Sequence, residues 1–114
     1  MTQSAGEAML SLHLRAAGIQ AMPEYQFCEG RRWRADFAIP NHRLLIEVDG
    51  GNRMAVIGKN GKAVAIGRHT QDADMEKLNE ANFLGWHVLR FSPAMVKSGV
   101  ALQTIERFLG LKNS

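Results

Sequence analysis

The fold of this chain is decided by two neighbouring runs, Arg34-Ala35-Asp36-Phe37-Ala38-Ile39 and Leu44-Leu45-Ile46-Glu47-Val48-Asp49-Gly50-Gly51. In each run apolar residues recur with a period of two, which is typical of a β-strand with one apolar face. The residues Pro40-Asn41-His42-Arg43 lie between the runs and predict a hairpin with a loop of two or four residues. The apolar faces are predicted to comprise Trp33, Phe37 and Ile39 in the first strand and Leu44, Ile46 and Val48 in the second.

Three acidic side chains, Asp36, Glu47 and Asp49, are expected on the opposite faces of this hairpin. Both loop lengths pair Ile39 with Leu44, and they therefore place Asp36 directly opposite Glu47. Like charges in that position destabilise a sheet by a few tenths to about 1 kcal/mol. A divalent cation held by the carboxylate oxygens would offset this repulsion. The facing acids therefore favour a metal site.

The composition fits a single globular domain over residues 1–114. Apolar residues make up 46% of the chain and charged residues 22%, which argues against disorder. No long apolar stretch or secretion signal is visible, and the single Cys28 fits a reducing compartment. We therefore expect a cytoplasmic protein with no membrane partner. The net charge of +3 and the pI of about 9.4 reflect grouped basic residues, a weak pattern of nucleic-acid binding.

Periodicity and turn residues predict the remaining elements. Ser4-Ala5-Gly6-Glu7 has the pattern of a capping box and starts a helix from about Ala5 to Ala17. An Asn60-Gly61 turn predicts a hairpin arm over about residues 52–67. The other expected elements are a strand at 25–27, a helix from about Thr70 or Asp72 to Leu84, a strand at 86–91 and a C-terminal helical region over about 93–110 with a break near Ser98-Gly99. A helix that crosses between core strands predicts an α/β fold with a mixed central sheet.

In their order and spacing these elements resemble the PD-(D/E)XK nuclease superfamily, and in particular small phage-type endonucleases related to the very short patch repair endonuclease. The resemblance rests on Glu7 in the first helix, Asp36, the Ile46-Glu47-Val48-Asp49 strand end, Gly67-Arg68-His69-Thr70 followed by Asp74-x-Glu76-Lys77-x-Asn79, and Gly85-Trp86-His87-Val88-Leu89-Arg90-Phe91. It implies a restriction-endonuclease-like core (αβββαβ), with a mixed sheet flanked by helices and the hairpin as an extra arm. Asp49 departs from the pattern, because the family usually has a lysine at that position.

The resemblance also implies a metal-dependent DNA endonuclease that acts in repair or recombination on nicked, mismatched or branched DNA such as Holliday junctions. Asp36, Glu47 and the backbone carbonyl of Val48 would hold the metal, and their oxygen atoms suit Mg²⁺, with Mn²⁺ as a substitute. The metal would polarise the scissile phosphate and lower the pKa of an attacking water. The alternative is that Asp36 and Glu47 are solvated strand acids. No small-molecule cofactor is expected.

Four further residues are catalytic candidates, each with a structural alternative. Asp49 either accepts a proton or completes the metal shell, or it forms a cross-strand ion pair with Arg34. Glu7 resembles the first-helix acid of the family and also fits the capping box. Lys77 resembles a substitute for the missing strand lysine, or it is a solvated lysine paired along its helix. His69, just before that helix, is a general acid or base, a phosphate contact, or a plain surface histidine.

DNA is the expected partner. The basic residues expected to meet its phosphates are Arg31, Arg32, Arg34, Arg53, Lys59, Lys62 and Arg68. Trp33 and Trp86 each begin an apolar strand and are expected in the core. Cutting both strands would favour a homodimer, with the apolar C-terminal helix as an interface, although packing on its own sheet is the default. The rival function is a non-catalytic DNA-binding or adaptor module that retains the fold.

Overall fold

The structure is a computed structural model that describes residues 3–49, 56–57, 63–64 and 68–111, with the backbone alone at 56–57, 63–64 and 68–71. Its elements follow the expected order of helix, three strands, hairpin, helix, strand and C-terminal helices. They are α1 (Ala5–Ala16), β1 (Met22–Tyr25), β2 (Ala35–Ile39), a 3₁₀ turn η1 (Pro40–His42), β3 (Leu44–Val48), β4 (Val56–Ile57), β5 (Ala63–Val64), α2 (Arg68–Phe83), β6 (His87–Phe91), α3 (Pro93–Ser98) and α4 (Val100–Phe108).

The central sheet has the strand order β1-β2-β3-β6. The pairs β1–β2 and β2–β3 are antiparallel, whereas β3 and β6 are parallel, because α2 crosses over between them. Ile39 pairs with Leu44, and the connection is the four-residue loop that ends at Arg43 in the left-handed conformation (φ 51°). Both the mixed α/β sheet and the hairpin register predicted from the sequence are confirmed.

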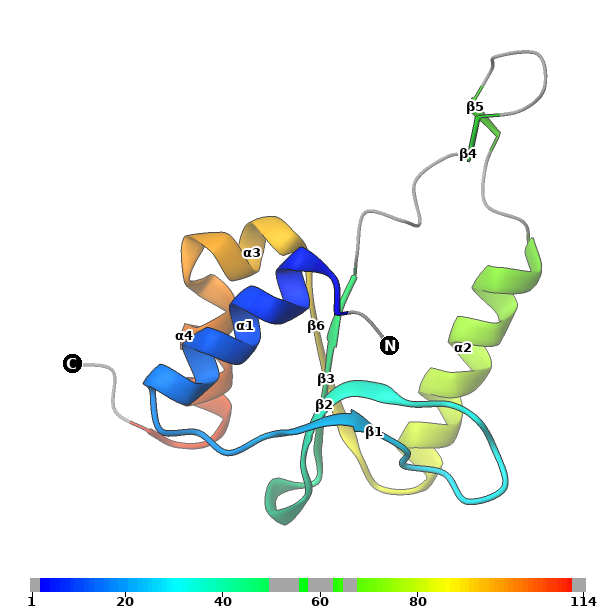
Figure 1. Ribbon diagram of the computed structural model, residues 1–114. Helices are drawn as coiled ribbons and strands as arrows, with labels where there is room; N and C mark the ends of the chain where they lie inside the picture. Colours follow the sequence, from blue (N-terminus) through cyan, green and yellow to red (C-terminus); the bar gives the residue numbers. More distant parts are fainter. Residues whose placement is uncertain (1–2, 50–55, 58–62, 65–67, 112–114) are drawn as a thin grey trace.

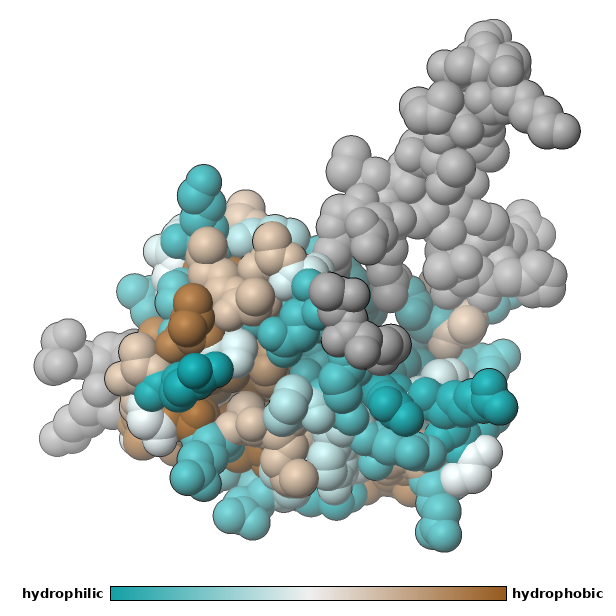
Figure 2. Space-filling model, viewed as in Figure 1, coloured by the Kyte–Doolittle hydropathy of each residue, from teal (hydrophilic) through white to brown (hydrophobic). Residues whose placement is uncertain are grey.

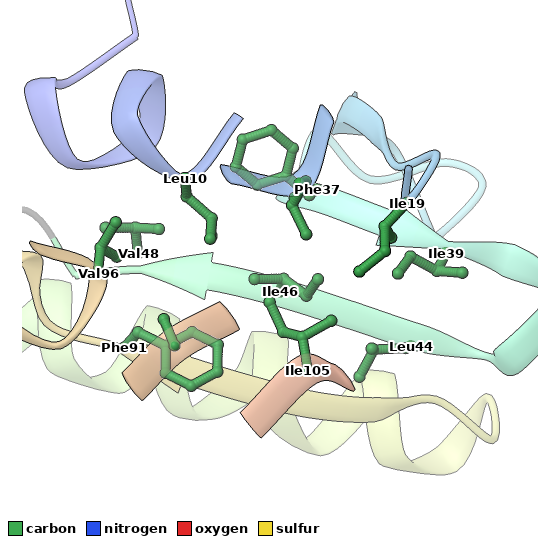
Figure 3. Close-up of a cluster of buried hydrophobic side chains, with 12 residues drawn as sticks. Leu10, Ile19, Phe37, Ile39, Leu44, Ile46, Val48, Phe91, Val96 and Ile105 are labelled. Carbon is green, nitrogen blue, oxygen red and sulfur yellow. The ribbon is translucent and has the colours of Figure 1, made fainter. Parts of the chain in front are cut away.

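Helices cover both faces of the sheet, with α1, α3 and α4 on one side and α2 on the other (Figure 1). The first face carries the larger apolar cluster, in which α1 and α4 enclose the strand side chains (Figure 3). Its buried members are Leu10, Leu14, Ile19, Phe37, Ile39, Leu44, Ile46, Val48, Phe91, Val96, Ala101 and Ile105. The predicted apolar face of Leu44, Ile46 and Val48 is therefore confirmed, as is the packing of the C-terminal helix on its own sheet.

The second cluster lies between the sheet and α2. It comprises Phe27, Cys28, Ala35, Ala38, Leu45, Ala81 and Trp86, with Tyr25, Trp33 and Val88 packed against it. Trp86 is 5% exposed, which confirms its predicted core position. The prediction that Trp33 shares a face with Phe37 and Ile39 is wrong, because β2 begins only at Ala35 and the period of two does not extend back to the tryptophan.

Two element boundaries differ from the predictions. The first strand lies at Met22–Tyr25 rather than at 25–27, and Pro23 is tolerated because β1 is an edge strand. Helix α2 begins at Arg68 rather than at Thr70 or Asp72, so His69 lies in the first helical turn and not in a turn before it. Arg68 and His69 have ordinary helix propensities, and Gly67 is the nearest residue that disfavours a helix.

The C-terminal region breaks where the sequence predicted. Ser92 caps α3, Gly99 adopts a left-handed conformation (φ 92°), and α4 follows directly. Of the predicted hairpin arm over 52–67, the described residues give the antiparallel pair β4–β5, and the Asn60-Gly61 turn lies outside them. No helix within the described ranges has the length and apolarity needed to cross a membrane.

Candidate active site

A row of charged residues runs across the sheet, one from each strand. The β1–β2 register pairs Pro23 with Phe37 and Tyr25 with Ala35, and this places Glu24 opposite Asp36. The β2–β3 ladder runs to the pair Phe37–Ile46, so the next residues along are Asp36 and Glu47.

The parallel β3–β6 register continues the row, because it pairs Glu47 with Arg90. Three acids and one arginine thus lie side by side, each on a different strand: Glu24 on β1, Asp36 on β2, Glu47 on β3 and Arg90 on β6.

The carboxylate of Asp36 is fixed by the backbone of β3. Its Oδ2 accepts a hydrogen bond from the N–H of Val48 at 2.7 Å, one residue beyond Glu47. The side chain thus binds a strand N–H beyond the last backbone pair of the β2–β3 ladder, Phe37–Ile46. This bond ties Asp36 to the same strand end that carries Glu47.

Lys77 projects from α2 onto the acidic row. Its Nζ lies 2.5 Å from Oε1 of Glu47 and donates to the carbonyl of Arg34 at 2.6 Å. Both side chains of the ion pair are 21% exposed, so the pair is shielded from bulk water without being sealed from it. The lysine therefore connects the helix, the acid on β3 and the chain segment that leads into β2.

Glu7 approaches the row from the N-terminus of α1. Ser4 caps the helix by accepting the Glu7 N–H at 3.2 Å, as the capping-box pattern predicts. The hydroxyl of Ser4 also donates to Oε1 of Glu7. A Cβ at Gly6 would meet Cγ1 of Val48 at 3.0 Å, so the glycine permits the close approach of α1 to the end of β3.

The electrostatics of the site disfavour ionised carboxyls. Burial raises the pKa of Asp36 above its ordinary value, and the charges of Glu24 and Asp49 add to the rise, whereas the Val48 hydrogen bond opposes it. Burial also raises the pKa of Glu47, against the opposing effect of Lys77. Clustered acids with raised pKa values are typical of functional sites.

The pKa of Glu7 is raised as well, first by burial and then by the charge of Asp36. The capping role and the proximity to the acidic row therefore both hold for this residue. Its position links the first helix to the strand acids.

Asp49, the residue at the usual lysine position, pairs with β6. Nη2 of Arg90 donates to both carboxylate oxygens of Asp49, at 3.0 and 3.2 Å. The backbone N–H of Asp49 donates to the carbonyl of Phe91 at 2.8 Å. Asp49 thus forms an ion pair with Arg90, whereas the hairpin register predicted one with Arg34.

The donor set suits a hard cation in part. Asp36 and Glu47 offer carboxylate oxygens from neighbouring strands, and burial together with mutual repulsion makes a positive charge between them favourable. Within the described ranges, no three His, Cys, Asp or Glu side chains lie close enough to form a ligand set alone. Backbone carbonyls or water would have to complete the shell.

The remaining site predictions divide into three groups. Arg31, Arg32 and Arg34 are exposed on the loop before β2, and the carbonyl of Arg34 accepts a hydrogen bond from Lys77. For Arg68 and His69 the structure describes only backbone, in the first turn of α2. Arg53, Lys59 and Lys62 lie outside the described residues.

Two residues of the row, Glu24 and Arg90, were missed from the sequence. The strand that carries Glu24 was not predicted because it contains Pro23, and proline in a run argues against a strand. Glu24 is also a non-glycine residue with a positive φ of 51°. Arg90 was visible in the final strand, but its place opposite Glu47 depends on the β3–β6 register, which local periodicity does not give.

The fold is a mixed α/β domain, with a four-stranded sheet between helices. A solved structure titled "Homing Endonuclease I-Bth0305I Catalytic Domain" shares it, with a TM-score of 0.62 and 20% sequence identity over 93% of this chain and 94% of that chain. At this identity the likeness concerns the fold. No protein-family model and no curated protein matches the chain.

Proposed function

We propose that this protein is a metal-dependent DNA endonuclease that hydrolyses phosphodiester bonds. The observation that carries the proposal is the convergence of Asp36, Glu47 and Lys77 from two strands and a helix. A domain that only binds a polyanion gains nothing from partly buried facing acids. The shared fold with a homing endonuclease catalytic domain supports the same class of activity.

In this proposal Asp36 and Glu47, together with the carbonyl of Val48, hold Mg²⁺ or Mn²⁺. The bound metal would polarise the scissile phosphate and lower the pKa of a water nucleophile. The ammonium group of Lys77, which lies beside Glu47, stabilises the negative charge that develops on the phosphate oxygens during the reaction. The products would be 5′-phosphate and 3′-hydroxyl ends, as is common in the resembled superfamily.

The other candidates take supporting roles. Glu7 and Glu24 add negative charge beside Asp36, which favours a bound cation. Asp49, held by Arg90, and His69 compete for the handling of protons. The substrates proposed from the resemblance are nicked, mismatched or branched duplexes in repair or recombination, and a homodimer would serve to cut two strands.

The second candidate function is a non-catalytic DNA-binding module that retains the fold. One observation favours it: the ammonium group of Lys77 already neutralises Glu47 at 2.5 Å, so the acids do not need a metal for charge balance. Metal dependence separates the two functions, because a cation that binds only the folded protein stabilises it by about 2.7 kcal/mol at a hundred times its Kd.

The deciding experiment is cleavage of labelled linear, nicked, mismatched, single-stranded and four-way-junction DNA with Mg²⁺ or Mn²⁺. Asp36→Asn and Glu47→Gln should abolish cutting. Asp72→Asn on the exposed side of α2 and Glu106→Gln on α4 make the same chemical changes away from the row and should cut like the wild type. DNA that is bound but never cut, with equal binding by all five proteins, would leave the binding module.

A further inference from the structure

A basic loop over residues 26–34 lies beside the acidic row, between β1 and β2. Phe27 and Cys28 anchor it in the second apolar cluster. The N–H of Arg31 donates to the carbonyl of Cys28 at 3.3 Å, the side chain of Gln26 donates to the carbonyl of Arg31 at 2.5 Å, and Gly30 turns the chain with φ 84°. These contacts fix the backbone from which the arginine side chains project.

One arginine of this loop is also ordered at its charged end. The guanidinium of Arg31 lies 4.3 Å from the centre of the Trp33 ring, and Trp33 packs on the second cluster. A cation over an aromatic face is held by the ring quadrupole, and the N–H groups of a stacked guanidinium stay available as donors. Arg31 is exposed, so the stacked guanidinium offers a planar fork of donors at the surface.

The loop is joined directly to the proposed catalytic residues. Nζ of Lys77 donates to the carbonyl of Arg34 at 2.6 Å while it pairs with Glu47. Arg31 is three residues from Arg34, a span of at most about 11 Å. Since a DNA strand rises about 3.4 Å per nucleotide, this span corresponds to roughly three nucleotides from the point where Arg34 contacts Lys77.

We infer that this loop is the backbone-binding subsite of the enzyme, and that Arg31, held in place by Trp33, binds a phosphate of the DNA strand that is cut. The inference rests on the proposed nuclease function and specifies how the strand is positioned. Trp33 acts as a positioning residue, because it acts through Arg31. Figure 2 agrees with this placement: hydrophilic surface covers the side that carries the loop, and apolar residues gather over α1 and α4.

The test compares DNA binding at increasing salt in EDTA, so that no cleavage occurs, with a fluorescein-labelled 30-base-pair duplex read by anisotropy. Arg31→Gln should flatten the dependence of log K on log salt by about 0.9, the value for one lost phosphate contact. Between 50 and 200 mM salt, the affinity advantage of the wild type should therefore shrink about 3.5-fold. Arg107→Gln, an exposed arginine on α4, is the matched control and should keep the wild-type slope.

The tryptophan variants distinguish positioning from bulk stability. Trp33→Leu should weaken binding at 50 mM salt with no loss of net charge, and Trp33→Phe should restore it, because a phenyl ring keeps an aromatic face under the guanidinium. Thermal melts confirm that each variant is folded. The inference would be overturned if Arg31→Gln had the same salt-dependence slope as Arg107→Gln and Trp33→Leu bound DNA with the same affinity as Arg107→Gln.

Failure of the inference and failure of the proposed function give different results. If the wild type cuts DNA with Mg²⁺ and Arg31→Gln binds and cuts equally well, the subsite is wrong and the nuclease stands. If the wild type neither binds nor cuts DNA, both are refuted.

Discussion

Removing the charge of Asp36 should stabilise the fold while it abolishes activity. The carboxylate lies beside Glu24 and Glu47 in the acidic row, and burial raises its pKa. An acid with a higher pKa in the folded state than in the unfolded state binds its proton more tightly when folded. The stability of the wild type therefore falls as the pH rises from below the ordinary value of 3.8 through the folded-state pKa.

The size of the effect follows from the neighbours of the carboxylate. Each like charge directly opposite costs a few tenths to about 1 kcal/mol, and Asp36 faces two. The side-chain amide oxygen introduced by Asp36→Asn would still accept the Val48 N–H, although a neutral bond is weaker by about 1 kcal/mol than one to a charged acceptor. The two repulsions together cost about 0.6–2 kcal/mol and the weaker hydrogen bond offsets about 1 kcal/mol of that, so with the sign given by the raised pKa of Asp36 we expect a net gain of up to about 1 kcal/mol. For 114 residues at about 2.1 cal/mol/K each, this corresponds to up to about 4 °C in Tm.

The assay is thermal unfolding of the wild type and Asp36→Asn, followed by circular dichroism in EDTA from pH 3 to pH 8. The variant should melt higher at pH 7, by up to about 4 °C. The difference should close at pH 3, where the carboxyl is protonated in both the folded and the unfolded state. Asp72→Asn, on the exposed side of α2, controls for the chemical change and should stay within about 0.5 kcal/mol of the wild type at both pH values. A lower Tm at pH 7, or the same gain at both pH values, would refute the electrostatic reasoning.

Three further substitutions test other contacts. Lys77→Met should raise the pKa of Glu47 further, as measured by NMR titration of the glutamate carboxyls. It should also lower the free energy of unfolding in urea by about 1–2 kcal/mol. This cost is smaller than for a fully buried ion pair, because both side chains are 21% exposed. Gly6→Val should lower the free energy of unfolding by about 1–3 kcal/mol, because the added Cβ would lie 3.0 Å from Cγ1 of Val48 on β3. Arg43→Asn tolerates the left-handed backbone but removes the guanidinium 4.1 Å above Trp86, so it should cost about 1 kcal/mol and shift the tryptophan emission to the red.

Each of these expectations has its own control. The double variant of Lys77→Met with Glu47→Gln should recover part of the lost stability, and no recovery would mean that the lysine acts independently of the acid. Ala8→Val, on the exposed side of α1, should cost only the lost helix propensity, up to about 0.7 kcal/mol. Since propensity alone would make Gly6→Val favourable, a cost of Gly6→Val no larger than that of Ala8→Val would contradict the clash. An unchanged emission maximum in Arg43→Asn would show that the arginine does not shield the indole.

The local parts of the fold were predictable because local chemistry determines them. The capping box at Ser4, the break at Gly99 and the pairing of Ile39 with Leu44 all follow from residues close together in the sequence. The start of α2 was placed too late, because polar residues such as Thr70 and Asp72 are good caps and also acceptable helix residues.

The candidate site was predictable only where it depended on the hairpin. Asp36 and Glu47 are brought together by a four-residue loop, so their proximity could be derived. The contact of Lys77 with Glu47 depends on how α2 packs on the sheet, and the positions of Glu24 and Arg90 depend on two other strand registers. Such long-range geometry is set by tertiary packing and not by periodicity.

The row of charged residues makes the loops around the sheet intolerant of changes in length. The position of Glu47 in the row depends on the length of the loop that ends at Arg43. The position of Arg90 depends on the turn at Gly85 that leads into β6. Side chains alternate between the two faces of a strand, so one inserted or deleted residue that slips a strand sends its row member to the opposite face. Variation among descendants of this sequence should therefore appear as substitutions in these two loops, whereas insertions and deletions collect in segments that do not set a strand register.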